Sequence, residues 1–111
     1  MSLIPSIESE TLNAAEEALT LSALTADIVV VQVTGTFTGT ITFEASVDGT
    51  NYYAIAMKAS SQVSLATLGS TTTVPGLFSI AIQGFPNFRA RMSAYTSGDA
   101  VVTTSVARTS K

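Results

Sequence analysis

Hydrophobic and polar residues alternate with a period of two along most of this chain. The clearest stretch runs from Thr34 to Tyr53, and a strand with this pattern buries one face and leaves the other in water. The turn formers Asp48-Gly49-Thr50-Asn51 follow, and Tyr52-Tyr53-Ala54-Ile55 resumes a strand composition. The pattern predicts a β-hairpin with its return strand at residues 52–58. The expected inward positions are Phe37, Ile41, Phe43, Ala45 and Val47, and the outward ones are Thr40, Thr42, Glu44 and Ser46.

The same period predicts further strands over residues 18–25, 28–34, 77–83, 88–95 and 100–108. The run Ile28-Val29-Val30-Val31 is apolar on both faces, which is typical of a central strand covered on both sides. Gly35 and Gly39 suggest a corner between two strands, and Thr96-Ser97-Gly98-Asp99 suggests a turn. Seven to eight short strands at this spacing predict an all-β fold, specifically a two-sheet antiparallel β-sandwich.

The strand expected at residues 88–95 carries the chain's most distinctive charges. Its alternation points Phe88, Ala90, Met92 and Ala94 inward and Arg89, Arg91, Ser93 and Tyr95 outward. Two guanidiniums about 7 Å apart on one strand face can grip a carboxylate of a partner protein. They can equally pair across the sheet with Glu44, which adds little stability. Both interpretations stay open at the level of sequence.

Residues 1–16 do not share the strand pattern. Asn13 to Leu19 is locally helix-favouring, so this segment is expected to be an N-terminal arm or a short helix. Residues 17–108 would then form a single β-sandwich domain, and residues 109–111 a frayed tail. We expect the arm to contact a partner or a neighbouring subunit, chiefly through its apolar side chains Leu3, Ile4 and Ile7.

Composition narrows the classes of function. The chain of 111 residues has no cysteine and no histidine, so disulfides, thiolate metal sites and the usual general base near neutral pH are missing. We therefore expect it not to be an enzyme and to need no cofactor. Charged residues make up 12% with a net charge of −3, so neither nucleic acid nor a membrane is an expected partner. No apolar run of transmembrane length and no secretory signal occurs, so assembly in the cytoplasm is expected.

Two further groups of residues are candidate ligand sites. Asp48, Asn51 and Asp99 offer oxygens for calcium, but turn geometry demands the same residue types and no calcium-loop spacing links them. Tyr52, Tyr53 and Tyr95 offer a platform for stacking sugars, although tyrosines at a strand start more often serve the core or an interface. A glycan is thus a possible but less favoured ligand, and no metal is expected.

Two stretches of the chain and the turn between them resemble a known group of proteins. They are similar to small jelly-roll-like β-sandwich modules of tailed-bacteriophage virions. The two stretches read GTFTGTITFEASVDGTNYYAI and FRARMSAYTSGDAVVTTSV, and the turn is Gly84-Phe85-Pro86. The resemblance spans Val33 to Val106. The residues that carry it are Gly39, Thr40, Phe43, Glu44, Ser46, Asp48 and Gly49, then Arg89, Arg91, Ala94, Tyr95, Thr96, Ser97 and Gly98.

The resemblance implies a structural virion protein. Modules of this kind look like capsid decoration (cement) proteins, head-fibre bases, or tail and baseplate domains, often as trimers. Because the chain carries neither a stalk nor a fibre beyond the module, we expect a decoration protein that binds the major capsid protein and itself as a homotrimer. The alternative is a tail, baseplate or head-fibre adaptor that binds carbohydrate or a receptor. Either would be located in the virion.

Overall fold

The computed structural model describes residues 6–22, 28–59, 68–81 and 85–107, and every helix-or-strand element in these ranges is a β-strand. None of these ranges holds a helix long and apolar enough to span a membrane. The strands are β1 (Ser6–Leu12), β2 (Ala18–Leu21), β3 (Ile28–Ser46), β4 (Tyr53–Ala54), β5 (Met57–Ala59), β6 (Leu68–Gly69), β7 (Thr71–Thr72), β8 (Gly76–Ala81) and β9 (Asn87–Ala107).

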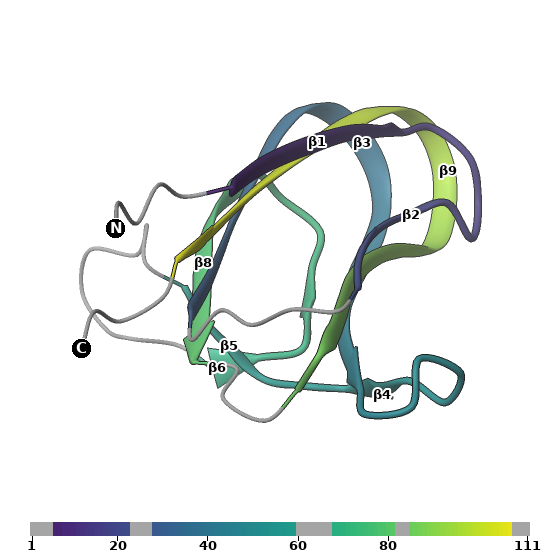
Figure 1. Cartoon of the computed structure of the whole chain (residues 1–111). Helices are drawn as coiled ribbons and strands as arrows, with labels where there is room; N and C mark the ends of the chain where they lie inside the picture. The colour runs from purple at the N-terminus through teal and green to yellow at the C-terminus, as the bar shows by residue number, and fades with distance from the viewer. Residues whose placement is uncertain (1–5, 23–27, 60–67, 82–84, 108–111) are drawn as a thin grey trace.

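All these strands belong to one antiparallel sheet. Its order is β1-β9-β3-β8-β5-β6, while β2 pairs with β9, and β4 and β7 pair with β3. The long strands β3 and β9 pair along their whole lengths and follow the same arch in Figure 1. We call the limb that contains residues 28–34 of β3 and 100–107 of β9 the first limb. The second limb contains residues 39–46 and 87–95 of the same strands.

The all-β antiparallel class predicted from the sequence is confirmed, but the expected division into two sheets is wrong. The strands predicted on either side of Gly35 are one strand, β3, and those on either side of residues 96–99 are one strand, β9. The predicted turn at residues 96–99 is therefore wrong as well. Gly98 has a φ of 90° and bends β9 without reversing it.

The bend brings the two backbones into close contact. A Cβ atom on Gly98 would collide with the carbonyl oxygen of Thr36 and lie 2.7 Å from Cα of Phe37. Gly35, with a φ of 99°, occupies the reciprocal place, where a Cβ would collide with the carbonyl oxygen of Asp99. The corner that the glycines predicted is thus present, but as a bend in a continuous ladder.

The predicted hairpin is present, with a shorter return strand than expected. Gly49 has a φ of 78° in the turn, and β4 pairs with Glu44 and Ala45 of β3. The chain then leaves β3, and β5 pairs with β8 and β6. Because β3 is paired with β4 over only two residues, Val47 lies beyond the ladder and is exposed instead of buried.

The N-terminal expectation of an arm or short helix does not hold for residues 6–12. These residues form β1, which pairs with β9 from Ser6 opposite Val106 to Leu12 opposite Ala100. Leu12 is fully buried. The missed signal is the alternation of Ile7, Ser9 and Thr11 with two glutamates, a strand pattern whose polar members hid it. Residues 1–5 lie outside the described ranges.

The inward faces of both limbs form one core. The predicted alternation is confirmed at β2 (Leu19, Leu21) and in β9, where Val102 and Thr104 are fully buried. Residues 28–34, however, are not covered on both sides, because Ile28 is 43% exposed. The core cluster is Leu12, Leu19, Leu21, Val29, Val31, Val33, Ile41, Phe43, Met57, Phe78, Phe88, Ala90, Met92, Ala100 and Val102.

Candidate functional site

A cluster of four charged side chains lies on the outward-facing side of the second limb. Glu44 of β3 accepts hydrogen bonds from two neighbours on β9: Arg89 Nε at 2.5 Å, and Arg91 through Nη2 at 2.8 Å and Nε at 3.2 Å. Arg91 Nη1 also donates to Glu16 at 2.8 Å. We call Glu16, Glu44, Arg89 and Arg91 the charge cluster. It is the arrangement that β-strand register produces when Glu44 faces Arg89 directly.

Burial makes this cluster more than a surface ion pair. The Glu44 side chain is only 8% exposed, whereas those of Arg89 and Arg91 are 29% and 22% exposed. The hydrogen bond from Arg91 is the main reason that the pKa of Glu44 is below its ordinary value, with Arg89 adding to the effect and burial opposing it. The same bond to Glu44 raises the pKa of Arg91. Both groups stay charged near neutral pH.

The short segment between β1 and β2 positions Glu16. Its backbone N–H donates to the carbonyl of Met92, and Met92 N–H donates to the carbonyl of Glu17, both at 2.8 Å. Glu16 has a φ of 72°, a left-handed conformation that a non-glycine residue adopts at a cost. The segment is therefore hydrogen-bonded to the edge of β9, between the parts of β9 that pair with β1 and with β2. This attachment holds the Glu16 carboxylate against Arg91.

The guanidiniums of Arg89 and Arg91 are thus engaged within the chain, through the cross-strand pairing with Glu44 that the sequence allowed. Arg89 also stacks on Tyr52, with Cζ 4.0 Å from the ring centroid. The other role, a grip on a partner's carboxylate, stays a prediction. Of the expected arm contacts, Ile7 is 67% exposed on β1, whereas Leu3 and Ile4 lie outside the described residues.

Tyr95 does not share the outward face of the two arginines. It packs against the hydrophobic core, and its hydroxyl donates to the carbonyl of Gly98 at 3.0 Å, while Ala94 is exposed. The cause is an irregularity in pairing, because the β3 register shifts between Thr40 and Ile41, opposite Met92–Ala94. One extra residue in a strand exchanges its two faces, and strict alternation cannot reveal it.

The Asp48 carboxylate serves its turn. Oδ1 accepts hydrogen bonds from the backbone N–H of Thr50 and Asn51 at 2.8 Å and from Ser46 Oγ at 3.0 Å, and Oδ2 accepts one from Asn51 Nδ2 at 2.9 Å. These donors, above all the N–H of Asn51, lower the pKa of Asp48. Asp99 lies at the bend, opposite Thr36, and does not pair with the turn that holds Asp48 and Asn51, so the three residues weighed as candidate calcium ligands are not brought together. No group of metal-binding side chains occurs in the described ranges.

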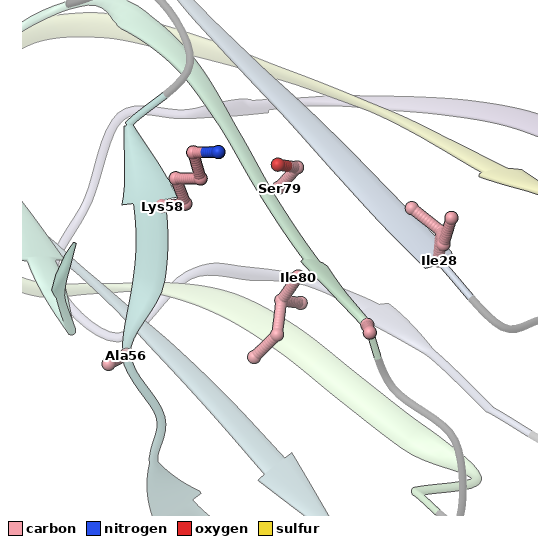
Figure 2. Close-up of a pocket in the computed structure, with 6 residues that line it drawn as sticks. Ile28, Ala56, Lys58, Ser79 and Ile80 are labelled. Carbon is pink, nitrogen blue, oxygen red and sulfur yellow. The ribbon is translucent and has the colours of Figure 1, made fainter. Parts of the chain in front are cut away.

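The first limb presents a broad outward surface with very few charges. Strand register places its side chains in rows, for example Ile7, Ser105, Val30, Ser79 and Lys58. Figure 2 shows Lys58 and Ser79 projecting to one side of β5 and β8, while Ile80 projects to the other. We call this surface the outer face; it consists of Ile7, Ser9, Thr11, Ile28, Val30, Gln32, Thr34, Lys58, Leu77, Ser79, Ala81, Val101, Thr103 and Ser105.

Sequence reasoning missed the outer face as a unit. Lys58 is the one charged residue among its members. A shallow hollow of about 340 Å³ is lined by Ile28, Lys58, Ser79 and Ala81 of this face together with Ala56 and Ile80. Ser9 and Thr103 share a hydrogen bond of 3.1 Å between their hydroxyls. The available signal was the clustering of Thr, Ser and Val, but only the register shows that these residues share one surface.

The three tyrosines proposed for sugar stacking lie in different settings. Tyr52 lies under Arg89, Tyr95 packs on the core, and Tyr53 is 73% exposed. Tyr53 instead lines a cleft of about 400 Å³ together with Phe85. Sequence reasoning did not consider Phe85 as part of a ligand site. We call this the hairpin-tip cleft; it is lined by Ala45, Ser46, Val47, Asp48, Asn51, Tyr53, Ile55 and Phe85.

No protein-family model and no curated protein matches the chain. Its fold matches a solved structure. The SPBc2 prophage-derived protein YomS superposes with a TM-score of 0.69 at 19% identity, over 96% of this chain and 97% of that one. A Bacillus endospore appendage protein, described as forming disulfide-linked pili, covers 97% of this chain and 90% of its own at 15% identity. Its TM-score of 0.45 is too low to indicate a shared fold.

Proposed function

We propose that this protein is a structural virion protein of a tailed bacteriophage that binds the outer capsid surface. In this role it acts as a decoration (cement) protein, associates as a homotrimer and is not an enzyme. The observation that carries the proposal is the outer face. A wide sheet surface with one charge in it can be covered by another protein without removing ion pairs from water.

The outer face has the dimensions that such contacts need. Five neighbouring strands spaced about 4.8 Å apart span roughly 20 Å, and four rows of side chains along the strands span a similar length. A surface of this extent supplies a large part of the approximately 800 Å² that each partner buries in a standard interface. The charges of the second limb are meanwhile paired with one another, so they do not oppose association.

The mechanism would be a clamp across capsid subunits. Each bound copy adds contact area that must be broken before the shell comes apart, so binding stabilises the assembled state by mass action. The similarity of fold to a prophage-derived protein supports a phage origin. Ile7 of β1 belongs to the outer face and is 67% exposed, so it is a suitable anchor for the contact proposed for the N-terminal region.

The test is to measure the mass of the purified protein in solution and then its sedimentation with capsids assembled without it. We expect a trimer that co-sediments with the capsids and raises their melting temperature. A monomer that does not sediment with capsids would refute the proposal.

A tail, baseplate or head-fibre adaptor is the second candidate, and the hairpin-tip cleft favours it. Its exposed aromatic rings suit recognition of a receptor. Antibody labelling of intact virions followed by electron microscopy separates the two, because label on the head supports decoration and label confined to the tail supports the adaptor.

A further inference from the structure

The hairpin-tip cleft gathers exposed apolar side chains that a folded protein ordinarily buries. Val47 is 70% exposed, Tyr53 73% and Phe85 36%, and all three line the same cleft. Phe85 lies more than thirty positions along the chain from the hairpin, so the cleft exists only in the folded protein. Its volume of about 400 Å³ falls within the range of small-ligand sites.

Two aromatic rings give this cleft a defined chemistry. Aromatic faces offer a large and rigid contact area, and they attract the C–H groups of a flat saturated ring through dispersion. Tyr53 extends from β4, which is held to β3 opposite Ala45, so the ring stands on a paired strand and not on a free loop. The half-buried Ile55 continues the apolar wall.

One polar group at the rim selects the kind of ligand. Asp48 Oδ1 already accepts three hydrogen bonds, whereas Oδ2 accepts one, from Asn51. Because Oδ2 accepts fewer hydrogen bonds than Oδ1, Oδ2 is the oxygen that can accept one more from a ligand. The backbone donors that hold Asp48 also keep it ionised, so the rim is negatively charged. A ligand should therefore donate hydrogen bonds and carry no negative charge.

We propose that the hairpin-tip cleft binds a neutral carbohydrate ring, with Tyr53 and Phe85 against its apolar face and Asp48 accepting a hydrogen bond from a hydroxyl group. A sugar ring combines one apolar face with hydroxyl donors along its edge, which is the combination that the cleft presents. The inference does not rest on the decoration role, because a protein on the head or on the tail can carry such a site; it names the ligand class for the cleft that the adaptor candidate uses.

The test is an NMR titration of the ¹⁵N-labelled full chain with neutral sugars: glucose, galactose, N-acetylglucosamine and their disaccharides, with glucuronate as the anionic counterpart. We expect saturable shifts confined to residues 47–55 and 85 with at least one neutral sugar. Glucuronate should bind several-fold more weakly than glucose, because its carboxylate approaches Asp48. The absence of saturable shifts with every sugar up to about 100 mM would overturn the proposal.

Variants separate the cleft from the rest of the surface. Tyr53→Ala should lower the affinity at least tenfold, whereas Tyr53→Phe keeps the ring and should leave it within about twofold. The matched control is Val74→Ala, which shortens another exposed apolar side chain outside the cleft. Equal affinity in Tyr53→Ala and in the unchanged chain would refute the site. Because Tyr53 is largely exposed, the NMR spectrum of Tyr53→Ala should show an intact fold, with changes only near the substituted residue.

Discussion

The two limbs of the sheet share their long strands and their core, yet their outward surfaces differ in chemistry: one is charged and the other is almost uncharged. On the second limb, Glu44 is buried beneath two guanidiniums, and every charge of the cluster has a partner. On the first limb, the outward positions of the same strands carry hydroxyl, amide and aliphatic groups. The second limb therefore stabilises itself, whereas the first limb offers a surface that another molecule can cover at little electrostatic cost.

The limbs also differ in how they treat a buried polar group. Glu44 is nearly inaccessible and fully hydrogen-bonded, but Thr104 of the first limb is completely buried and its hydroxyl has no hydrogen-bond partner. A buried hydroxyl without a partner costs free energy, because it leaves water without compensation. The buried carboxylate of the second limb therefore has its hydrogen bonds, whereas the buried hydroxyl of the first limb does not.

The bend that separates the limbs gives the largest expected effect. Gly98→Ala forces a Cβ into the Thr36 carbonyl at a positive φ, and we expect a loss of about 3 kcal/mol or more in the free energy of unfolding. Urea denaturation measures it. The control is Gly69→Ala, where the nearest atom is 3.9 Å away, and its change should stay below about 1 kcal/mol. Equal stabilities would contradict the role of Gly98.

Removing the central charge of the second limb comes next. Glu44→Gln removes the carboxylate that Arg89 contacts and leaves Arg91 with Glu16 alone, and we expect a loss of about 2–3 kcal/mol in unfolding free energy. Glu10→Gln on the exposed surface of β1 is the matched control, with an expected change within about 0.5 kcal/mol. If Glu44→Gln lowered the free energy of unfolding by less than about 0.5 kcal/mol, the charge cluster would add no stability.

Acid should weaken the second limb through the same carboxylate. The pKa of Glu44 is lower in the folded protein than in the unfolded chain, so its contribution is fully present above the unfolded value near 4.5 and is lost as pH falls through the folded value. Asp48 acts in the same direction. Thermal unfolding from pH 7 to pH 2 should show a falling melting temperature below about pH 4.5, with a shallower fall in Glu44→Gln.

The unsatisfied hydroxyl of the first limb predicts a gain. Thr104→Val replaces it with a methyl group of similar shape, and we expect the free energy of unfolding to rise by about 1 kcal/mol. The parallel change Thr11→Val, at an exposed position of β1, should change it by less than about 0.5 kcal/mol. A destabilised Thr104→Val variant would show that the hydroxyl has a partner after all.

A charge on the outer face should have the smallest effect on stability and a clear effect on association. Gln32→Lys places a cation at an exposed central position of the first limb, and we expect less than about 0.5 kcal/mol of change in unfolding. Co-sedimentation with capsids or self-association should fall sharply, whereas Thr73→Lys, outside the outer face, should leave both unchanged. Equal behaviour of the two variants would place the contact surface elsewhere.

Local patterns in the sequence determined much of this fold. Alternation in residues 41–45 and 77–81 predicted strands and most of their buried side chains, because a period of two can be recognised without knowing the neighbouring strands. The apolar run at residues 28–31 predicted a strand as well, but not which of its faces is buried. Asp48-Gly49 established the hairpin turn through its conformational preference and its side-chain hydrogen bonds. The acidic and basic partners Glu44 and Arg89 were also visible, since both lie at outward positions of predicted strands.

Only the tertiary structure decided how these strands join and what their surfaces become. Glycines at positions 35 and 98 signal a local break in regularity, but whether the chain reverses or bends depends on the paired strand. The register shift near Thr40 exchanged the faces of Ala94 and Tyr95, and a shift of one residue is invisible without the partner. The outer face and the hairpin-tip cleft combine residues far apart in sequence, so these two sites exist only once the strands have paired and the chain has folded.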